Sequence, residues 1–395
     1  MPVTLAYCTN LFPSETLADV SQALVRFGAP LRRRLGATTL PLGLCFSARA
    51  ARELEAPGAL EAFAGEIASL GLRAATLNAF PYGGFHATRV KEDVFRPTWE
   101  EPARAEHTER ACRLLAALLP PGATGAVSTH TGTFKEFGVG EEGDARIARA
   151  WLRLALSLAR LEDETGRRIV LSVEPEPLSR LETSAETVRF FESLWTAPLR
   201  RAAAEWSVSA SWLEAAARRH VGVCFDVCHQ SVEFEDPPQA MRRLAAAGIT
   251  IGKMQASIAP RLERPSERPD GLARLAAFAE PRWLHQTFAL APSGELSSRR
   301  DLPDALADVD FLRHAQEIRT HFHLPIFLEA SGPLATTRRD LERACEEAAS
   351  RTSCVEVETY TLASLPEPPV DDAAVVETMA RELEFAARAC GLAGS

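Results

Sequence analysis

The sequence lacks the features that would send a chain to a membrane or to nucleic acid. Basic residues are in deficit, with 44 Lys and Arg against 53 Asp and Glu and a formal net charge of −9. This balance repels polyphosphate, so nucleic acid is not an expected partner. No segment approaches the roughly 18 uninterrupted apolar residues of a membrane span. Residues 1–15 show no basic start, apolar stretch or cleavage site of a signal peptide, and we therefore expect a cytoplasmic protein.

The cysteines do not read as a disulfide framework. The sequence has eight of them, scattered along the chain. Cys8, Cys45, Cys112 and Cys345 lie in apolar strand-like or helical contexts. This usage predicts buried free thiols in a reducing compartment.

Short β-like runs alternate with amphipathic helical stretches along almost the whole chain, which indicates a parallel sheet. Thr183 and Glu186 have capping-box spacing where a helix should follow a strand. Eight such units predict a single (β/α)8 TIM barrel, and such barrels often exceed 250 residues as one domain, here residues 1–395. The expected strands are 5–10, 42–47, 74–80, 125–132, 169–176, 222–229, 250–257 and 354–361, and the expected helices include 15–34, 58–70, 103–119, 144–165, 183–195, 208–219 and 335–350.

One region exceeds the count of eight strands. Residues 321–328 (HFHLPIFL) also read as a strand, and 283–296 resemble a hairpin. We interpret 258–330 as an insertion between the seventh and eighth strands, with a register that uses 321–328 as a barrel strand as the alternative. Residues 371–391 predict an amphipathic C-terminal helix that seals the barrel beside the first strand.

Polar residues occupy alternate positions near the carboxyl end of several expected strands. Side chains alternate between the two faces of a strand, so residues two apart share the barrel interior. An enzyme barrel keeps its chemistry at this end of the strands. The expected inward pairs are Thr76 and Asn78, Ser128 and His130, Ser172 and Glu174, Cys224 and Asp226, Lys253 and Gln255, and Glu356 and Glu358.

The inward acids need compensation, because an isolated buried carboxylate costs several kcal/mol. We expect Glu174, Asp226 and Glu358, with Gln255 on the seventh strand, to form a polar ring that holds Mg²⁺, Mn²⁺ or Zn²⁺. The alternatives are neutralisation by Lys253 and nearby histidines, or a proton on one acid. For catalysis we nominate Glu174, Glu358, His130 and Lys253.

Further residues are candidates for substrate binding. His229 follows Asp226 at D-x-x-H spacing, and His321 and His323 lie two apart, so they share a face of an extended segment. The glycine-rich loop PYGGFH (81–86) after the third strand lets the backbone approach a ligand. The substrate-binding candidates are Asn78, Tyr82, Phe85, His229, His321 and His323. We expect Phe80, Tyr82 and Phe85 to wall the pocket, and the role of His285 stays open.

Several strings resemble known proteins. They are YCTNLFPSE (7–15), TLNAFPYGGFH (76–86), VKEDVFRPTW (90–99), VEPEPL (173–178), CFDVCHQSVEFED (224–236), GKMQAS (252–257), HFHLPIF (321–327) and VEVETYT (355–361). The set of acids resembles the xylose-isomerase-like superfamily of sugar isomerases, epimerases and related endonucleases. The strings, in order along nearly the whole chain, resemble its EboE branch, the metabolite traffic proteins of bacterial ebo gene clusters.

The resemblance implies a xylose-isomerase-like barrel with metal ligands at Glu174, Asp226 and one of Glu356 or Glu358. The seventh-strand ligand of the superfamily is usually a histidine, where this chain has Gln255. We expect a metal-dependent isomerase, epimerase or lyase acting on a small polyhydroxylated metabolite, associated with secondary-metabolite maturation or traffic. The alternative is a non-catalytic metabolite-binding or hand-over protein, and proteins of the same gene cluster are possible partners. A DNA-repair nuclease of the superfamily is disfavoured by the net charge.

Overall fold

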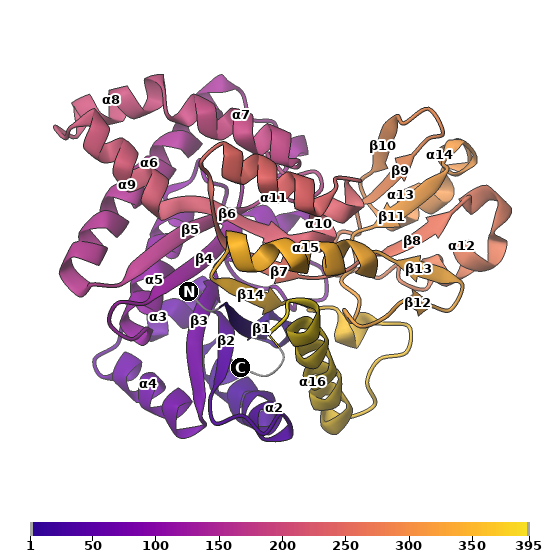
Figure 1. Ribbon diagram of the computed structural model, residues 1–395, viewed down its shortest axis with the longest axis horizontal. Coiled ribbons are helices and arrows are strands. Elements are labelled where there is room, and N and C mark those ends of the chain that lie inside the picture. The colour runs from indigo at the N-terminus through magenta and orange to yellow at the C-terminus, as the bar shows by residue number, and fades with distance from the viewer. Residues whose placement is uncertain (1–2, 393–395) are drawn as a thin grey trace.

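A closed barrel of parallel strands forms the body of the molecule (Figure 1). The computed structural model describes residues 3–392, and within them eight strands close the barrel in the order β1-β14-β7-β6-β5-β4-β3-β2. The eight strands expected from the sequence are those of the barrel. Their bounds are β1 (Thr4–Cys8), β2 (Leu40–Cys45), β3 (Leu72–Asn78), β4 (Thr124–His130), β5 (Arg168–Glu174), β6 (Val221–Asp226), β7 (Thr250–Ala256) and β14 (Cys354–Val357).

Helices cover the outside of the barrel (Figure 1). The Thr183 side chain accepts a hydrogen bond from the backbone N–H of Glu186, so the predicted capping box begins α7. Within residues 3–392, no helix has both the length and the apolar character needed to cross a membrane. The surrounding helices are α1 (Leu17–Ala23), α2 (Ala29–Arg34), α3 (Ala48–Glu53), α4 (Ala59–Ser69), α5 (Pro102–Leu118), α6 (Glu141–Thr165), α7 (Ser184–Leu194), α8 (Ala197–Glu205), α9 (Ala210–His220), α10 (Val227–Val232), α11 (Pro237–Ala246), α15 (Arg338–Arg351) and α16 (Asp372–Ala389).

Strand alternation separates an apolar outer face from a polar interior. Leu171 and Val173 of β5 belong to the core between strands and helices, whereas Glu174 turns inward. Glycine on β2 makes room for a large interior side chain: a Cβ on Gly43 would lie 2.0 Å from Oε2 of Glu356. The barrel interior is therefore filled with polar side chains, and glycine on a strand provides the space that a large one needs.

A second, antiparallel sheet lies between β7 and β14 in the sequence and to one side of the barrel (Figure 1). Residues 321–328 form no strand in the described chain, so the alternative register is wrong, and the eighth barrel strand is β14. β9 and β10 form a hairpin over 287–299, so the hairpin expected at 283–296 lies further toward the C-terminus, and the sheet continues to Thr336, beyond the expected limit of 330. Its elements are β8 (Pro260–Glu263), α12 (Pro269–Ala276), β9 (Thr287–Leu290), β10 (Leu296–Arg299), α13 (Leu302–Ala307), α14 (Val309–His314), β11 (Glu317–Thr320), β12 (Ala330–Ser331) and β13 (Leu334–Thr336).

The C-terminal helix α16 packs beside the first strand. Its Glu382 is fully buried and accepts hydrogen bonds from the Tyr7 hydroxyl (2.6 Å), the Thr359 hydroxyl (2.6 Å) and the Ile326 backbone N–H (3.1 Å). Tyr7 lies on β1, and Thr359 follows β14. The helix therefore holds the barrel closed at the junction of its first and last strands.

Candidate metal centre and active site

Three carboxylates meet at the carboxyl ends of the barrel strands. Glu174 ends β5, Asp226 ends β6 and Glu358 follows β14. One oxygen of each lies within 4.8 Å of the others, and all three side chains are buried. The structure thus brings together the three acids that the sequence nominated as metal ligands.

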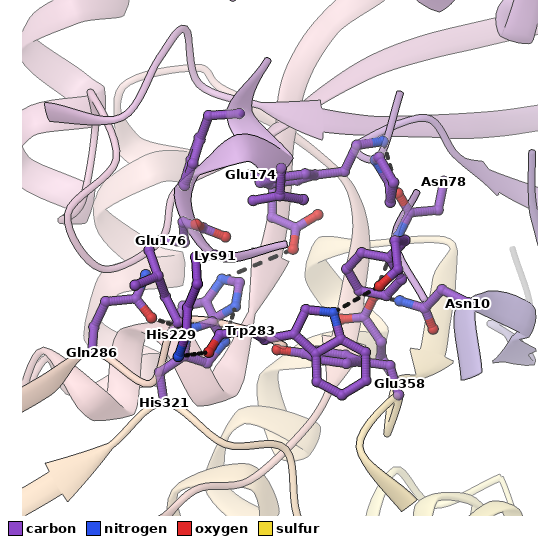
Figure 2. A pocket seen from close by; sticks show the side chains of 17 residues that line it. Asn10, Asn78, Lys91, Glu174, Glu176, His229, Trp283, Gln286, His321 and Glu358 are labelled. Atoms are coloured by element: carbon purple, nitrogen blue, oxygen red, sulfur yellow. Dashed lines mark hydrogen bonds and ion pairs between the residues drawn. The ribbon is translucent and has the colours of Figure 1, made fainter. Parts of the chain in front are cut away.

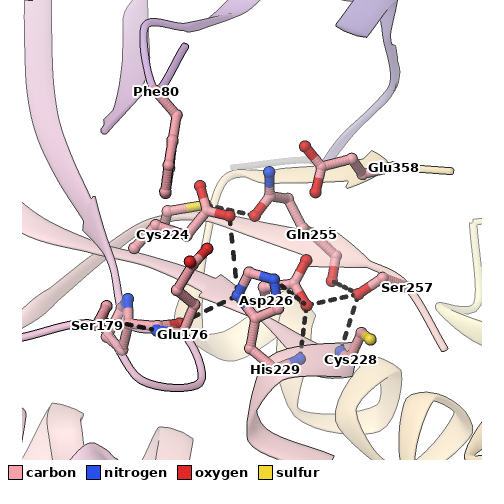
Figure 3. Close-up of polar contacts among 12 residues, drawn as sticks. Phe80, Glu176, Ser179, Cys224, Asp226, Cys228, His229, Gln255, Ser257 and Glu358 are labelled. Atoms are coloured by element: carbon pink, nitrogen blue, oxygen red, sulfur yellow. Dashed lines mark hydrogen bonds and ion pairs between the residues drawn. The ribbon is translucent and has the colours of Figure 1, made fainter. Parts of the chain in front are cut away.

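The hydrogen bonds around these acids are incomplete. Glu358 accepts from the side-chain amides of Asn10 (2.7 Å) and Asn78 (3.3 Å), and Figure 2 shows both amides beside it. Oδ1 of Asp226 accepts from the Ser257 hydroxyl (2.8 Å) and the His229 backbone N–H (2.9 Å), as seen in Figure 3. Within residues 3–392, Oε2 of Glu174 and Oδ2 of Asp226 have no hydrogen-bond partner. Buried oxygens with free lone pairs are available to a cation.

Burial and the neighbouring carboxylates disfavour negative charge on Glu174 and Glu358. Burial, and then the charge of Asp226, raise the pKa of Glu174 to about 8. The same causes, with the charge of Glu174 ahead of that of Asp226, hold the pKa of Glu358 well above its usual range. A divalent cation would supply the missing positive charge, and the oxygen-rich donor set fits Mg²⁺ or Mn²⁺.

Lys253 forms its ion pair with Glu356 and not with one of these three acids. Its ammonium lies 2.6 Å from Oε1 of Glu356, and both side chains have no exposed surface. The Thr76 hydroxyl also donates to Glu356. Lys253, Glu356 and Thr76, which we name the lower layer, are one strand repeat below Gln255, Glu358 and Asn78. Of the two acids of β14 and its extension, Glu358 is therefore the one beside Glu174 and Asp226, and Lys253 lies outside the cavity lining.

Gln255 lies in register with Asp226 on one side and Glu356 on the other. Its Oε1 accepts from the Cys224 thiol at 3.0 Å, while its Nε2 has no partner among the described residues. In this orientation the amide presents an N–H group, not a lone pair, to its surroundings. Gln255 remains a predicted ligand only with its amide rotated by a half-turn.

A cavity opens above Glu174 and Glu358, two of the three acids (Figure 2). Including its open mouth, the cavity encloses about 550 Å³. Glu174, Glu358, His229 and His321 line it on the polar side. Apolar walls around a few converging polar groups are typical of small-molecule sites.

Three aromatic rings gather at this cavity. Phe85, Trp283 and Tyr360 contact one another with ring centroids 4.9–5.4 Å apart. They come from the loop after β3, from the insertion and from the segment after β14. Lys91 lies in the segment after β3 and connects it to the insertion. Its ammonium donates to Asp301 Oδ2 (2.6 Å) and to the Trp283 carbonyl (2.6 Å). The insertion therefore completes the wall of the barrel cavity.

Two expected residues lie elsewhere. Phe80 and Phe85 line the cavity, but Tyr82 packs edge-on against His107, away from it, so the expectation that Tyr82 walls the pocket is wrong. Tyr82 lies in a loop, where side chains do not alternate as they do on a strand, so the sequence did not predict which way its side chain points. His130 is buried beside the rings of Phe80 and Phe95 and does not line the cavity.

The histidines of α10 and of the insertion meet beside Asp226. Nε2 of His321 lies 3.1 Å from Nε2 of His229 and 3.3 Å from Nε2 of His323. Burial lowers the pKa of His229 to about 4 and holds that of His321 well below its usual range. His285 has a supporting place, with Nδ1 2.8 Å from the backbone carbonyl of His321 and Nε2 2.9 Å from Glu280.

Other lining residues escaped the sequence reasoning. Asn10 and Tyr360 stand just after barrel strands, and Glu176 follows Glu174 at the same parity, so strand position was a usable signal for these three. Trp283 and Gln286 belong to the insertion, where no periodicity marked them. Their contribution depends on how the insertion folds over the barrel.

The barrel and the polar ends of its strands define a xylose-isomerase-like TIM-barrel fold. No family model and no curated protein matches the chain. Among solved structures it is similar to a xylose isomerase-like TIM barrel protein from Mycobacterium smegmatis in complex with magnesium, at 11% identity and a TM-score of 0.51 over 98% of both chains. It is also similar to an L-ribulose 3-epimerase, at 13% identity and 0.49 over 100% of this chain and 99% of that one. The IOLI protein with a bound zinc atom matches at 10% and 0.49 over 98% of both chains. The fold assignment rests on the first of these.

Proposed function

We propose that this protein is a divalent-metal-dependent isomerase- or epimerase-like barrel that acts on a small polyhydroxylated metabolite. The observation that carries the proposal is the convergence of oxygens of Glu174, Asp226 and Glu358 within 4.8 Å beside the cavity. Such a donor set suits Mg²⁺ or Mn²⁺, which also bind the neighbouring hydroxyl and carbonyl oxygens of a sugar. The magnesium of the M. smegmatis structure agrees with this choice.

In this proposal Glu174 and Glu358 carry the proton. Isomerisation and epimerisation by proton transfer both remove a proton from a carbon next to a carbonyl; isomerisation returns it to the neighbouring carbon, and epimerisation returns it to the opposite face of the same carbon. In the metal-free protein, burial and then the charge of Asp226 raise the pKa of Glu174 to about 8, which supports Glu174 as a group able to hold a proton. Asn10 and Asn78 orient Glu358. A divalent cation, when bound, would polarise the substrate carbonyl and stabilise the negative charge that develops on it.

The other two catalytic candidates receive supporting roles. Lys253 neutralises Glu356 below the site, and His130 packs among aromatic rings outside the cavity. His229 and His321, which line the cavity, are placed to contact substrate hydroxyls, with His323 behind them. Phe85 and Asn78 complete the predicted substrate contacts.

The resemblance to the EboE branch extends the proposal to the metabolite itself. It favours a precursor of secondary metabolism as the ligand and proteins of the same gene cluster as partners. A non-catalytic hand-over protein is the second candidate. Gln255 favours it, because its oxygen is engaged by Cys224 and offers no seventh-strand ligand to a metal.

Hydrogen exchange tests the proposed reaction. The Mn²⁺-loaded protein is incubated with ketopentoses and ketohexoses in heavy water, and deuterium next to the carbonyl is followed by NMR. We expect exchange with the natural protein and with His220→Gln, a variant of the buried histidine that ends α9, and none with Glu174→Gln. Saturable sugar binding without any exchange would overturn the enzyme and favour the hand-over protein.

A further inference from the structure

The cavity has two chemically different sides. Its polar side ends at the carboxylates, where Oε2 of Glu174 has no hydrogen-bond partner within residues 3–392. Its apolar side comes from the segments after β3 and β14 and from the insertion, and Figure 2 shows the Trp283 indole at the cavity. We define the apolar side by six lining residues, Phe80, Phe85, Phe95, Trp283, Leu284 and Tyr360.

The polar groups on the apolar side are already engaged within the protein. Nε1 of Trp283 donates to the Phe85 carbonyl at 3.0 Å. The neighbouring Lys91 ammonium has three N–H groups. It donates to Asp301 Oδ2 (2.6 Å) and to two backbone carbonyls (2.6 and 3.1 Å), so none is left over. In the described chain, the Tyr360 hydroxyl is the one polar side-chain group of the apolar side that makes no hydrogen bond.

This arrangement favours an apolar group of a ligand. A hydroxyl that leaves water needs a new hydrogen-bond partner, and the apolar side offers only the Tyr360 hydroxyl. An apolar group gains free energy there, because its surface is removed from water. Five of the six residues are aromatic, and neighbouring rings among them lie with centroids 4.9–5.7 Å apart. An aromatic ring of the ligand can join such a set in the same edge-to-face or tilted arrangements.

A bare sugar fits this side less well. The C–H face of a sugar can pack on an aromatic ring, but its hydroxyls point outward from the edge of the sugar ring. On the apolar side they would lie among side chains that offer almost no partner. Hydroxyls find polar neighbours on the opposite side of the cavity, beside Glu174, Glu176 and His229.

We propose that the substrate has two parts, a pair of adjacent oxygens that reaches the carboxylates and an aromatic ring that lies against Phe85 and Trp283. The inference rests on the proposed function and narrows its metabolite to an aryl-substituted hydroxycarbonyl compound. The size of the cavity agrees with such a ligand. Its volume of about 550 Å³ falls within the roughly 300–1,000 Å³ of pockets that bury drug-sized molecules.

This division gives the insertion a part in specificity. The acids stand on or directly after barrel strands, whereas Trp283 and Leu284 belong to the insertion. The barrel therefore supplies the groups that act on the oxygens, and the insertion supplies part of the surface that selects the substituent.

Hydroxamates that share one head group and differ in their tails test the inference. Their two adjacent oxygens bind a divalent cation as those of an enediolate do. Isothermal titration calorimetry of the Mn²⁺-loaded protein compares acetohydroxamate, phenylacetohydroxamate and D-threonohydroxamate, whose tail carries hydroxyls. Burial of the phenyl group should raise the affinity about 10- to 100-fold over acetohydroxamate. The hydroxylated tail should give at least about 10-fold weaker binding than the phenyl tail.

Variants locate the gain in affinity. Phe85→Ala and Trp283→Ala should each weaken binding of phenylacetohydroxamate about 5- to 10-fold and leave the affinity for acetohydroxamate unchanged. The control Tyr82→Ala, in the same loop as Phe85 but off the cavity, should keep both affinities. Circular dichroism verifies that each variant is folded, and Phe85→Ala decides if Trp283→Ala does not fold.

The outcomes separate this inference from the proposed function. D-threonohydroxamate that binds as tightly as phenylacetohydroxamate, or more tightly, overturns the inference and leaves the proposed function in place. A preference for the phenyl tail that persists undiminished in the folded aromatic variants also overturns it. If no hydroxamate binds the Mn²⁺-loaded protein more tightly than the metal-free protein, the proposed function fails, and the inference that rests on it fails as well.

Discussion

Two layers of the same barrel interior treat charge in opposite ways. In the lower layer, Lys253 and Glu356 form an ion pair at 2.6 Å that has no exposed surface. One strand repeat higher, Glu174, Asp226 and Glu358 face one another, and two of their oxygens have no partner in the described chain. Both layers lie on the same strands and both are buried, so they differ in the positive charge and the hydrogen-bond donors that each layer contains. The lower layer is complete by itself, and the upper layer is complete only with a cation or a proton.

The difference separates structural from functional polar groups. A buried ion pair whose two groups bind each other has no ligand atom left to offer. Buried carboxylate oxygens without a partner, in contrast, attract a cation or a proton to the cavity. A further buried acid, Glu382, is intermediate between the two layers, since it accepts hydrogen bonds from neutral donors only. Four changes break or sharpen this comparison.

Removal of the buried ammonium should have the largest effect. Lys253→Met leaves Glu356 buried without its counter-charge, which should lower the free energy of unfolding by about 3–5 kcal/mol. Urea unfolding at neutral pH measures it. The double variant Lys253→Met with Glu356→Gln should recover most of the loss, and equal losses in the single and double variants would contradict a self-sufficient pair.

Glu382 should make stability depend on pH. Burial raises its pKa from 4.5 to about 7. Between these values the folded protein holds a proton that the unfolded chain releases, so this contribution to stability is full below pH 4.5 and is lost as the pH rises through 7. The shift corresponds to at most about 3 kcal/mol. Urea unfolding of Glu382→Gln should show a flatter pH profile across this interval than the natural protein, and an unchanged profile would refute the assignment.

Neutralising one acid of the upper layer should remove the response to metal. A ligand at a hundred times its dissociation constant stabilises a protein by about 2.7 kcal/mol. Mn²⁺ should therefore raise the melting temperature of the natural protein and of the control Glu382→Gln, and leave Glu174→Gln unchanged. In chelator, Glu174→Gln should melt no lower than the natural protein, because a repelling charge is gone. A Mn²⁺ response that persists in Glu174→Gln would place the cation elsewhere.

The smallest effect is expected at the mouth of the cavity. Phe85→Ala removes one of three aromatic rings in mutual contact, and should speed extraction of the cation by a chelator several-fold, with a stability change of about 1 kcal/mol. Stopped-flow chelation measures the rate. Tyr82→Ala, in the same loop but off the cavity, serves as the control and should leave the rate unchanged. Equal rates in Phe85→Ala and the natural protein would show that these rings do not cover the site.

The sequence by itself determined the eight barrel strands, the cap of α7 and the inward direction of Glu174, Asp226 and Glu358. These features depend on local regularities, since side chains alternate along a strand and a cap involves residues three apart. The tertiary structure decided the rest. It paired Lys253 with Glu356 across β7 and β14, turned Tyr82 away from the cavity, and brought His321 and His323 of the insertion to His229. Those outcomes depend on closure of the barrel and on the path of long connections, which bring together residues far apart in the chain and leave no periodic trace in the sequence.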